Sequence, residues 1–340
     1  MIYFICFLIA FVLLLLLFVY GKTVDVNVVI LILVIVVGNG GYMALALSQN
    51  LNEAILANKI TYVIGTFVPM ILMLVVADIC RVTISQWVKV LMYFGQILIY
   101  LSVVTIGMSD IFYETAEFHT GPFGAYLTKT YGFMHTVYIV TLISYTFISI
   151  CIGLISLDRK TVVGRNNVLI ILFVDFFTVS MYIMERFVHL NVELMPLIFT
   201  FGVAIILIPI FRIYSYSIYN NRYILEKQMS GTGYIIFDKD MRFMGCNDAA
   251  IEFYPELKDW ELEVRIPGNG GRFNTFLRQN FTSYVENASI GDVMDKTYEY
   301  KERVVNYTID HLMWNKKRAI GYVICINDMT SVVRRSDIPK

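Results

Sequence analysis

The sequence predicts an α-helical membrane protein with seven transmembrane helices, followed by a small α+β domain with an antiparallel sheet. Hydrophobic residues make up 57% of the 340-residue chain and charged residues only 16%, whereas about a quarter of the residues in a soluble domain are charged. The charges are also uneven, because 20 of them lie in positions 1–220 and 34 in the last 120. The chain therefore has a membrane part and a water-soluble part, and a fully soluble or disordered protein is excluded.

Seven apolar runs are long enough to cross a bilayer, which takes roughly 17–25 residues in a helix. The first run has no basic amino-terminal region and no small-x-small cleavage site, and it is too long for the apolar part of a signal peptide. We therefore predict that it is retained, which makes 1–213 a seven-transmembrane region. The spans are expected at about 2–20, 26–47, 60–80, 87–107, 132–156, 168–187 and 194–213.

The Lys and Arg residues of the loops predict the orientation, because short cytoplasmic loops are enriched in them. With the amino terminus outside, nine lie on the cytoplasmic side and three on the other. The nine are Lys22, Arg81, Lys89, Arg159, Lys160, Arg165, Arg212, Arg222 and Lys227, and the three are Lys59, Lys129 and Arg186. An odd number of spans then places the carboxy-terminal domain in the cytoplasm. The prediction is a multi-pass protein of the plasma membrane, in contact with lipid.

Asp175 is a candidate ligand-binding residue, because it lies about a third of the way into the sixth span. A charge there costs a few kcal/mol even on lenient insertion scales, so it indicates a ligand contact or a protonation switch, with a protonated Asp hydrogen-bonded to a neighbouring helix as the alternative. His135, just inside the fifth span, is a second candidate, with a helix-contact residue as the alternative. Glu185 and Arg186 can reach the headgroup region, so no special role is expected for them.

The longest outer loop, at about 108–131, is acidic and aromatic. Long loops in compact structures are often functional, so this one is either part of a ligand mouth or a solvated connector. Retinal chemistry is excluded, because the seventh span contains no Lys to form a Schiff base.

The last part of the chain alternates short apolar runs with turn residues. After a polar connecting helix at 214–230, the pattern predicts strands at about 234–237 and 242–246 and a helix from Ala249 that Asn247 and Asp248 cap. A second helix is expected at about 273–284, followed by strands at about 297–302, 303–312 and 318–327. This order indicates an α+β domain with an antiparallel sheet over 231–335 and a short tail at 336–340.

Both ends of this domain resemble a PAS domain. Residues 233–243 read GYIIFDKDMRF and 247–250 read NDAA, which is similar to the opening strand, Asp-rich turn, second strand and helix of that family. Residues 321–330 read GYVICINDMT, which resembles the last PAS strand and its Asp-x-Thr motif. The resemblance implies that Asp328 and Thr330 couple the sheet to an output domain.

The membrane region resembles the amino-terminal seven-span region of bacterial histidine kinases and diguanylate cyclases. The residues that carry this resemblance are 51–54, 59–69 with the sequence KITYVIGTFVP, and 131–135 with the sequence YGFMH. It implies a sensory receptor of a two-component type and a homodimer, with an output kinase or cyclase as partner. Tyr131, in the last of these motifs, joins Asp175 and His135 as a candidate ligand-binding residue.

No catalytic motif accompanies these domains. The four His residues lie outside a kinase phosphoacceptor context, and Gly270-Gly271-Arg272-Phe273 lacks the acidic pair of a cyclase. Glycine-rich phosphate loops and HExxH metal pairs are also missing. We therefore expect a non-catalytic chain whose output lies on a partner or on an extension.

The net charge and the cysteines add two further expectations. The formal net charge is zero, so no nucleic-acid partner is expected. Five scattered cysteines share no paired spacing, so neither disulfides nor a metal site is indicated, and the sequence identifies no cofactor. The favoured interpretation is a sensor module, and the alternative is a small-solute transporter or channel with a regulatory cytoplasmic domain.

Overall fold

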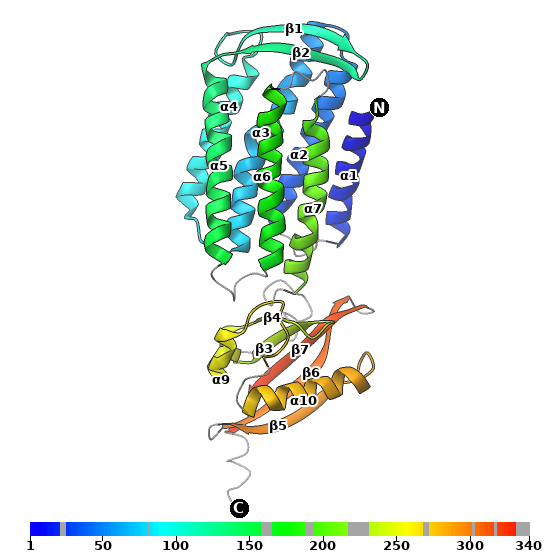
Figure 1. The fold of residues 1–340 in the computed structure, drawn as a ribbon, viewed down its shortest axis with the longest axis vertical. Helices are drawn as coiled ribbons and strands as arrows, with labels where there is room; N and C mark the ends of the chain where they lie inside the picture. The colour runs from blue at the N-terminus through cyan, green and yellow to red at the C-terminus, as the bar shows by residue number, and fades with distance from the viewer. Residues whose placement is uncertain are drawn as a thin grey trace, which may run out of the picture. The chain divides into compact units, whose positions relative to one another are not determined.

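The computed structural model describes residues 1–20, 25–80, 82–157, 165–187, 193–216, 231–267, 272–300, 303–315 and 318–330. They form two compact units, one of residues 1–158 with 166–211 and the other of 159–165 with 212–340. Figure 1 shows a helical unit and a smaller unit of sheet and helices. The predicted fold class is confirmed.

The described part of the first unit contains seven apolar helices. Six are long and apolar enough to cross a membrane, and the remaining one is the shorter apolar helix at the amino terminus. The chain is therefore a multi-pass membrane protein. The helices are α1 (Ile2–Tyr20), α2 (Val26–Leu47), α3 (Leu51–Ile79), α4 (Gln86–Val104), α5 (Phe133–Leu157), α6 (Arg165–Phe187) and α7 (Met195–Ser215).

Helix α3 begins at Leu51, about two and a half turns before the predicted start of the third span near residue 60. The cause is a polar first part that hydropathy does not detect. Asn50 caps the helix by accepting a hydrogen bond from the Glu53 backbone N–H at 3.0 Å, and the Glu53 carboxylate accepts one from Gln49 N–H at 2.9 Å. This reciprocal arrangement is a capping box.

The outer loop predicted at about 108–131 is mostly a β-hairpin. Strand β1 (Tyr113–Gly121) pairs with β2 (Gly124–Tyr131) in antiparallel register, with Phe118 opposite Leu127. The hairpin lies across one end of the helical bundle (Figure 1). Its Leu127 side chain is buried in a cluster with Leu45, Ala54 and Ala57, so the hairpin is packed onto α2 and α3.

Helices α2 and α3 approach closely because glycine lies between them. A Cβ atom on Gly41 would lie 2.8 Å from the Thr61 backbone nitrogen, which is too close for any side chain. Small residues at such contacts favour helix association in membranes, where lipid supplies no hydrophobic driving force. A polar contact joins α2 to α7, since Asn39 Nδ2 donates to Thr200 Oγ1 at 2.8 Å.

The second unit is a five-stranded antiparallel sheet with helices, as predicted. The strand order is β4-β3-β7-β6-β5. The strands are β3 (Gly233–Asp238), β4 (Phe243–Cys246), β5 (Met294–Tyr300), β6 (Arg303–Asn315) and β7 (Arg318–Asp328), and the helices are α9 (Asp248–Phe253), a 3-10 helix (Pro255–Asp259) and α10 (Arg272–Asn287).

Side chains of both faces of β3 are buried in this unit. Ile235 and Phe237 join a core with Phe281 of α10, while Tyr234 and Ile236 belong to a second cluster on the alternate positions. Most of the predicted connecting helix and the tail lie outside the described residues.

We predict that Gly41→Ala lowers the thermal stability of the purified chain. The new methyl group would force α2 away from the α3 backbone, at a cost of about 1–3 kcal/mol. The matched control is Gly95→Ala on α4, where an added Cβ has no neighbour within 4 Å. Thermal unfolding in detergent, followed by intrinsic fluorescence, gives the melting temperatures of both variants. Equal melting temperatures for Gly41→Ala and wild type would contradict the packing described here.

Candidate functional site

The first unit encloses a cavity of about 490 Å³. This volume is within the range of small-molecule sites, roughly 300–1,000 Å³. Its wall comes from α2, α3, β2, α5, α6 and α7. The residues that line it include Tyr42, Tyr62, Val68, Pro69, Leu72, Tyr126, Lys129, Tyr131, Tyr138, Leu142, Thr146, Asp175, Thr178, Tyr182, Glu185, Glu193, Phe199, Gly202 and Val203.

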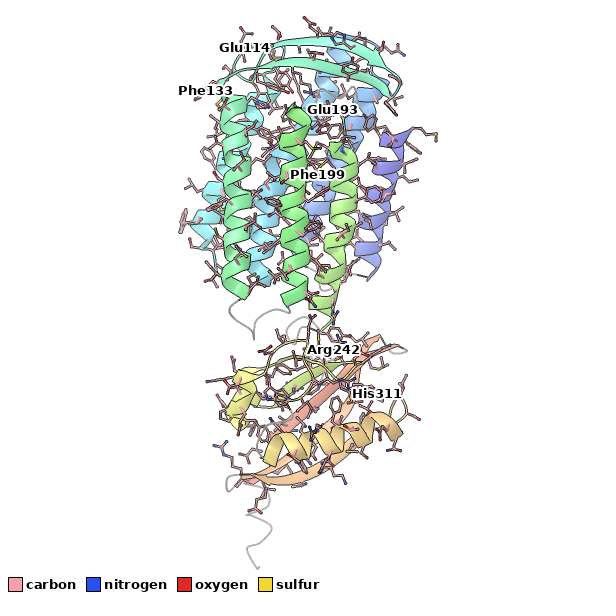
Figure 2. All side chains as sticks on the ribbon, viewed as in Figure 1. Glu114, Phe133, Glu193, Phe199, Arg242 and His311 are labelled. Atoms are coloured by element: carbon pink, nitrogen blue, oxygen red, sulfur yellow. The ribbon has the colours of Figure 1, made fainter. Side chains whose placement is uncertain are left out.

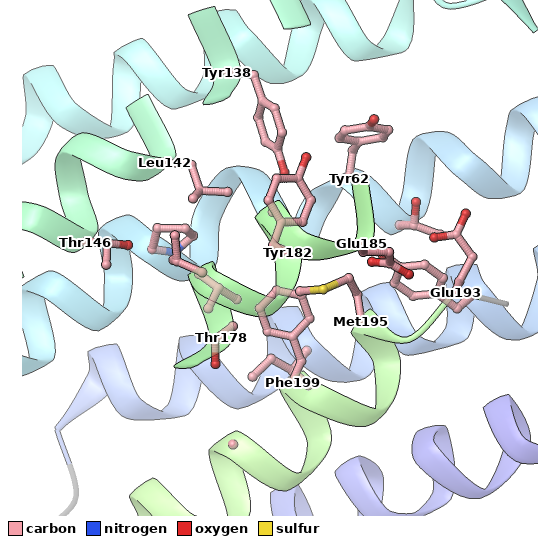
Figure 3. Close-up of a pocket in the computed structure, with 18 of the residues that line it drawn as sticks. Tyr62, Tyr138, Leu142, Thr146, Thr178, Tyr182, Glu185, Glu193, Met195 and Phe199 are labelled. Atoms are coloured by element: carbon pink, nitrogen blue, oxygen red, sulfur yellow. The ribbon is translucent and has the colours of Figure 1, made fainter. Parts of the chain in front are cut away.

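The cavity has two polar ends with an apolar stretch between them. Figure 3 shows Glu185 and Glu193 toward one end and Thr146 and Thr178 toward the other, with Phe199 and Leu142 in between. Asp175 and Glu185 both line it and are ten residues apart on α6, which corresponds to about 15 Å along a helix. The site is therefore long enough for a ligand with chemically different ends.

The end near the hairpin is closed by an ion pair. Lys129 Nζ of β2 lies 3.3 Å from Glu193 Oε1. Burial alone would lower the pKa of Lys129, but the Glu193 carboxylate and nearby phenols outweigh it and the pKa is raised. Glu185 accepts a hydrogen bond from Leu194 N–H at 2.7 Å, and Tyr3 Oη accepts one from Glu193 N–H at 3.1 Å. These contacts hold Glu193 and Leu194, which directly precede α7, next to the hairpin.

An aromatic cluster connects the hairpin to the helices beside the cavity. Asn58 donates to Tyr113 Oη at 3.0 Å, and Tyr113 Oη donates to Tyr62 Oη at 2.8 Å. Burial raises the pKa of Tyr113 to about 12, although Lys129 opposes the change. The rings of Tyr131 and His135 are stacked with their centroids 4.0 Å apart. The hairpin is thereby fixed to α3 and α5.

The far end of the cavity holds buried polar atoms that lack partners. Asp175 is 4% exposed and Thr146 is 5% exposed. Asp175 Oδ2 and Thr146 Oγ1 make no hydrogen bond to any described residue, whereas Thr178 Oγ1 donates to Val174 O at 2.7 Å. Buried polar atoms are costly unless a partner satisfies them, and a ligand in the cavity is positioned to do so.

Two of the three predicted ligand-binding candidates line the cavity. Asp175 and Tyr131 are part of the wall, while His135 is 1% exposed and belongs to the aromatic cluster beside it. Sequence analysis missed Lys129 and Glu185, because it assigned them to an outer loop and to the headgroup region, and it did not single out Glu193. Figure 2 shows Glu193 near the hairpin end of the bundle and Phe199 further along it.

The predicted exit residues, Asp328 and Thr330, are hydrogen-bonded at the end of β7. Asp328 Oδ1 accepts a hydrogen bond from Thr330 N–H at 2.8 Å, and Thr330 Oγ1 accepts one from Val304 N–H at 3.0 Å. Together they attach the end of β7 to β6 within the second unit. Among the described residues, no group of three or more His, Cys, Asp or Glu side chains is placed to hold a metal ion.

Comparison with known proteins assigns the helical unit. The family described as the N-terminal 7TM region of histidine kinase matches residues 2–218. The chain belongs to this family. Members of the histidine kinase 7TM family are sensory modules of signalling kinases, and here the match covers all seven helices, the hairpin and the whole cavity wall. No curated protein and no solved structure matches the chain.

We predict that Lys129→Met destabilises the hairpin end of this 7TM region, because it leaves Glu193 without its cation. Glu193→Gln in the same background restores part of the loss, with a coupling energy of about 1–2 kcal/mol in a double-mutant cycle. Since the pKa of Lys129 is raised, the pair's contribution is complete at neutral pH and disappears only as the pH rises beyond the ordinary Lys pKa of about 10.4. Thermal unfolding of the wild type, the two single variants and the double variant measures the coupling energy. Additive losses of stability would contradict the ion pair.

Proposed function

We propose that the chain is a membrane sensor whose cavity binds a small molecule and whose carboxy-terminal unit passes the signal on. The observation that carries this proposal is the cavity itself, with buried polar atoms of Asp175 and Thr146 that lack partners, inside a 7TM region of the histidine kinase family. A ligand acts by binding one arrangement of the helices more tightly than another, which shifts their populations.

The proposed orientation places the amino terminus and the hairpin outside the cell. The excess of Lys and Arg in the opposite loops supports it. In this orientation the Lys129–Glu193 end of the cavity faces the exterior, and α7, which runs without a break from Met195 to Ser215, leads to the cytoplasmic unit.

For the carboxy-terminal unit we propose a PAS domain that relays the signal. The first stretch of the PAS resemblance begins with β3 and continues through β4 to α9, and the second lies at the end of β7; β3 and β7 are paired neighbours in the sheet, with Ile235 opposite Ile324. Asn247 of the first stretch accepts a hydrogen bond from Tyr234 N–H at 2.8 Å and caps α9. The unit is proposed to be non-catalytic and to act, in a homodimer, on a kinase or cyclase output.

The test of the cavity is recovery of the molecule that occupies it. The full chain is reconstituted in lipid nanodiscs, exposed to medium in which its source cells have grown, washed, and extracted for mass spectrometry. Val203→Trp fills the cavity and should abolish retention of the recovered compound. Ile205→Trp on the same helix is the control, because Ile205 is 46% exposed and does not line the cavity. Equal retention by both variants would contradict a cavity site.

A liposome experiment separates sensing from transport. The compound recovered above is loaded inside liposomes that contain the full chain, and its release is compared with that from liposomes of lipid alone. The sensor proposal predicts equal release. Faster release through wild type but not through Val203→Trp would instead assign the cavity to a transport path.

We predict that Asp328→Ala uncouples the second unit from its output without unfolding the membrane unit. Loss of the carboxylate leaves Thr330 N–H without its acceptor and weakens the attachment of the end of β7 to β6. Cells carrying the variant should show the transcript profile of a gene deletion while keeping normal amounts of the protein in the membrane. The control is Asp259→Ala, an exposed carboxylate of the same unit. A wild-type profile for Asp328→Ala would contradict the exit role.

A further inference from the structure

The charges around the cavity select for a cation. Among the described residues of its wall, Asp175, Glu185 and Glu193 are acidic and Lys129 is the single basic side chain. Lys129 pairs with Glu193, and Glu185 accepts a backbone N–H. Asp175 has a neutral hydroxyl, that of Ser149 on α5, as its side-chain neighbour, and its Oδ2 makes no hydrogen bond to any described residue. An anionic ligand would add to this excess of negative charge, whereas a cation would offset it.

The groups at the Asp175 end accept hydrogen bonds. Asp175 Oδ2 and Thr146 Oγ1 come from α6 and α5 and line the same cavity. Both are more than nine-tenths buried. A primary ammonium group has three N–H donors, so it can satisfy both oxygens at once and give the carboxylate a charge-assisted bond.

The rest of the cavity suits an apolar or aromatic body. Val68, Pro69 and Leu72 of α3 form one side, and Leu142 and Val203 extend it. Six tyrosines line the cavity as well, and their rings can pack against an apolar or aromatic body. These are Tyr42, Tyr62, Tyr126, Tyr131, Tyr138 and Tyr182.

We propose that the ligand is a small primary amine with an apolar body, whose ammonium group is held by Asp175 and Thr146. This inference rests on the proposed sensory function and adds the chemical class of the ligand. The ammonium donates to Asp175 Oδ2 and Thr146 Oγ1, and the body extends along α6 toward Tyr182 and Glu185.

Calorimetry on the full chain in nanodiscs tests the proposal with matched probes. The amines are hexylamine, 2-phenylethylamine and tryptamine, the neutral isosteres are hexanol and 2-phenylethanol, and the anions are hexanoate and 3-phenylpropanoate. Empty nanodiscs supply the correction for lipid partitioning. We expect at least one amine to bind, its alcohol to bind at least tenfold more weakly, and the carboxylates not to bind.

Two variants assign the ammonium site. Asp175→Asn, nearly identical in shape, should weaken amine binding at least tenfold, and Thr146→Val should weaken it several-fold. Asp110→Asn makes the same chemical change at an exposed residue outside the cavity wall and should leave binding unchanged. Unaltered melting temperatures of the variants show that the fold is retained.

The outcomes separate this inference from the proposed function. Alcohols that bind as tightly as amines, failure of every amine to bind, or unchanged amine affinity in Asp175→Asn would each overturn the amine assignment. The sensory proposal would still stand if the compound recovered from nanodiscs were neutral or anionic and depended on Val203. It would fail if nothing were retained in the cavity, if Val203→Trp left retention unchanged, or if the liposomes showed a transport path.

Discussion

Close packing of α3 against its neighbours is the constraint on which the rest of the membrane unit depends. Lipid is as apolar as the helix surfaces, so helices associate through tight contacts and internal hydrogen bonds. Gly41 lets the α2 and α3 backbones meet, and Gly65 leaves room for the Tyr138 hydroxyl of α5. The hairpin end of α3 then presents Asn58 and Tyr62 to the hairpin. The contacts of α3 thus fix the positions of the neighbouring helices and of the hairpin.

The cavity arises where the same helices pack through small side chains and leave a space between them. Several of its wall residues are small, including Gly65, Thr146, Thr178 and Gly202, and larger side chains there would fill the volume. The buried polar atoms at the Asp175 end have no hydrogen-bond partner among the described residues, and such atoms are costly unless a partner satisfies them. In the proposed function, the ligand is that partner.

Hydropathy predicted the helices well and the site poorly. Long apolar runs mark spans such as Val26–Leu47 because the bilayer demands them. The start of α3 was missed because Asn58 and Lys59 resemble a loop, although the capping box at Asn50 and Glu53 was present in the sequence. Asp175 stood out because a charge inside a span is rare.

The hairpin end could not be predicted in the same way. Lys129 and Glu193 are 64 residues apart, and nothing local to either indicates that they pair. The alternation of Tyr126, Thr128 and Thr130 with Leu127 and Lys129 is a strand pattern in retrospect. This strand pattern was not recognised because the segment was expected to be a long loop.

The most direct test of the account is hydrogen exchange of the full chain in nanodiscs, with the cavity empty and with it occupied by 2-phenylethylamine or by the compound recovered from the medium. The account predicts that occupancy changes the exchange of β3 and β7 amides in the second unit, and that Val203→Trp removes this change. Protection confined to the membrane helices, with the exchange of β3 and β7 unaltered, would contradict a sensor that signals through its carboxy-terminal unit.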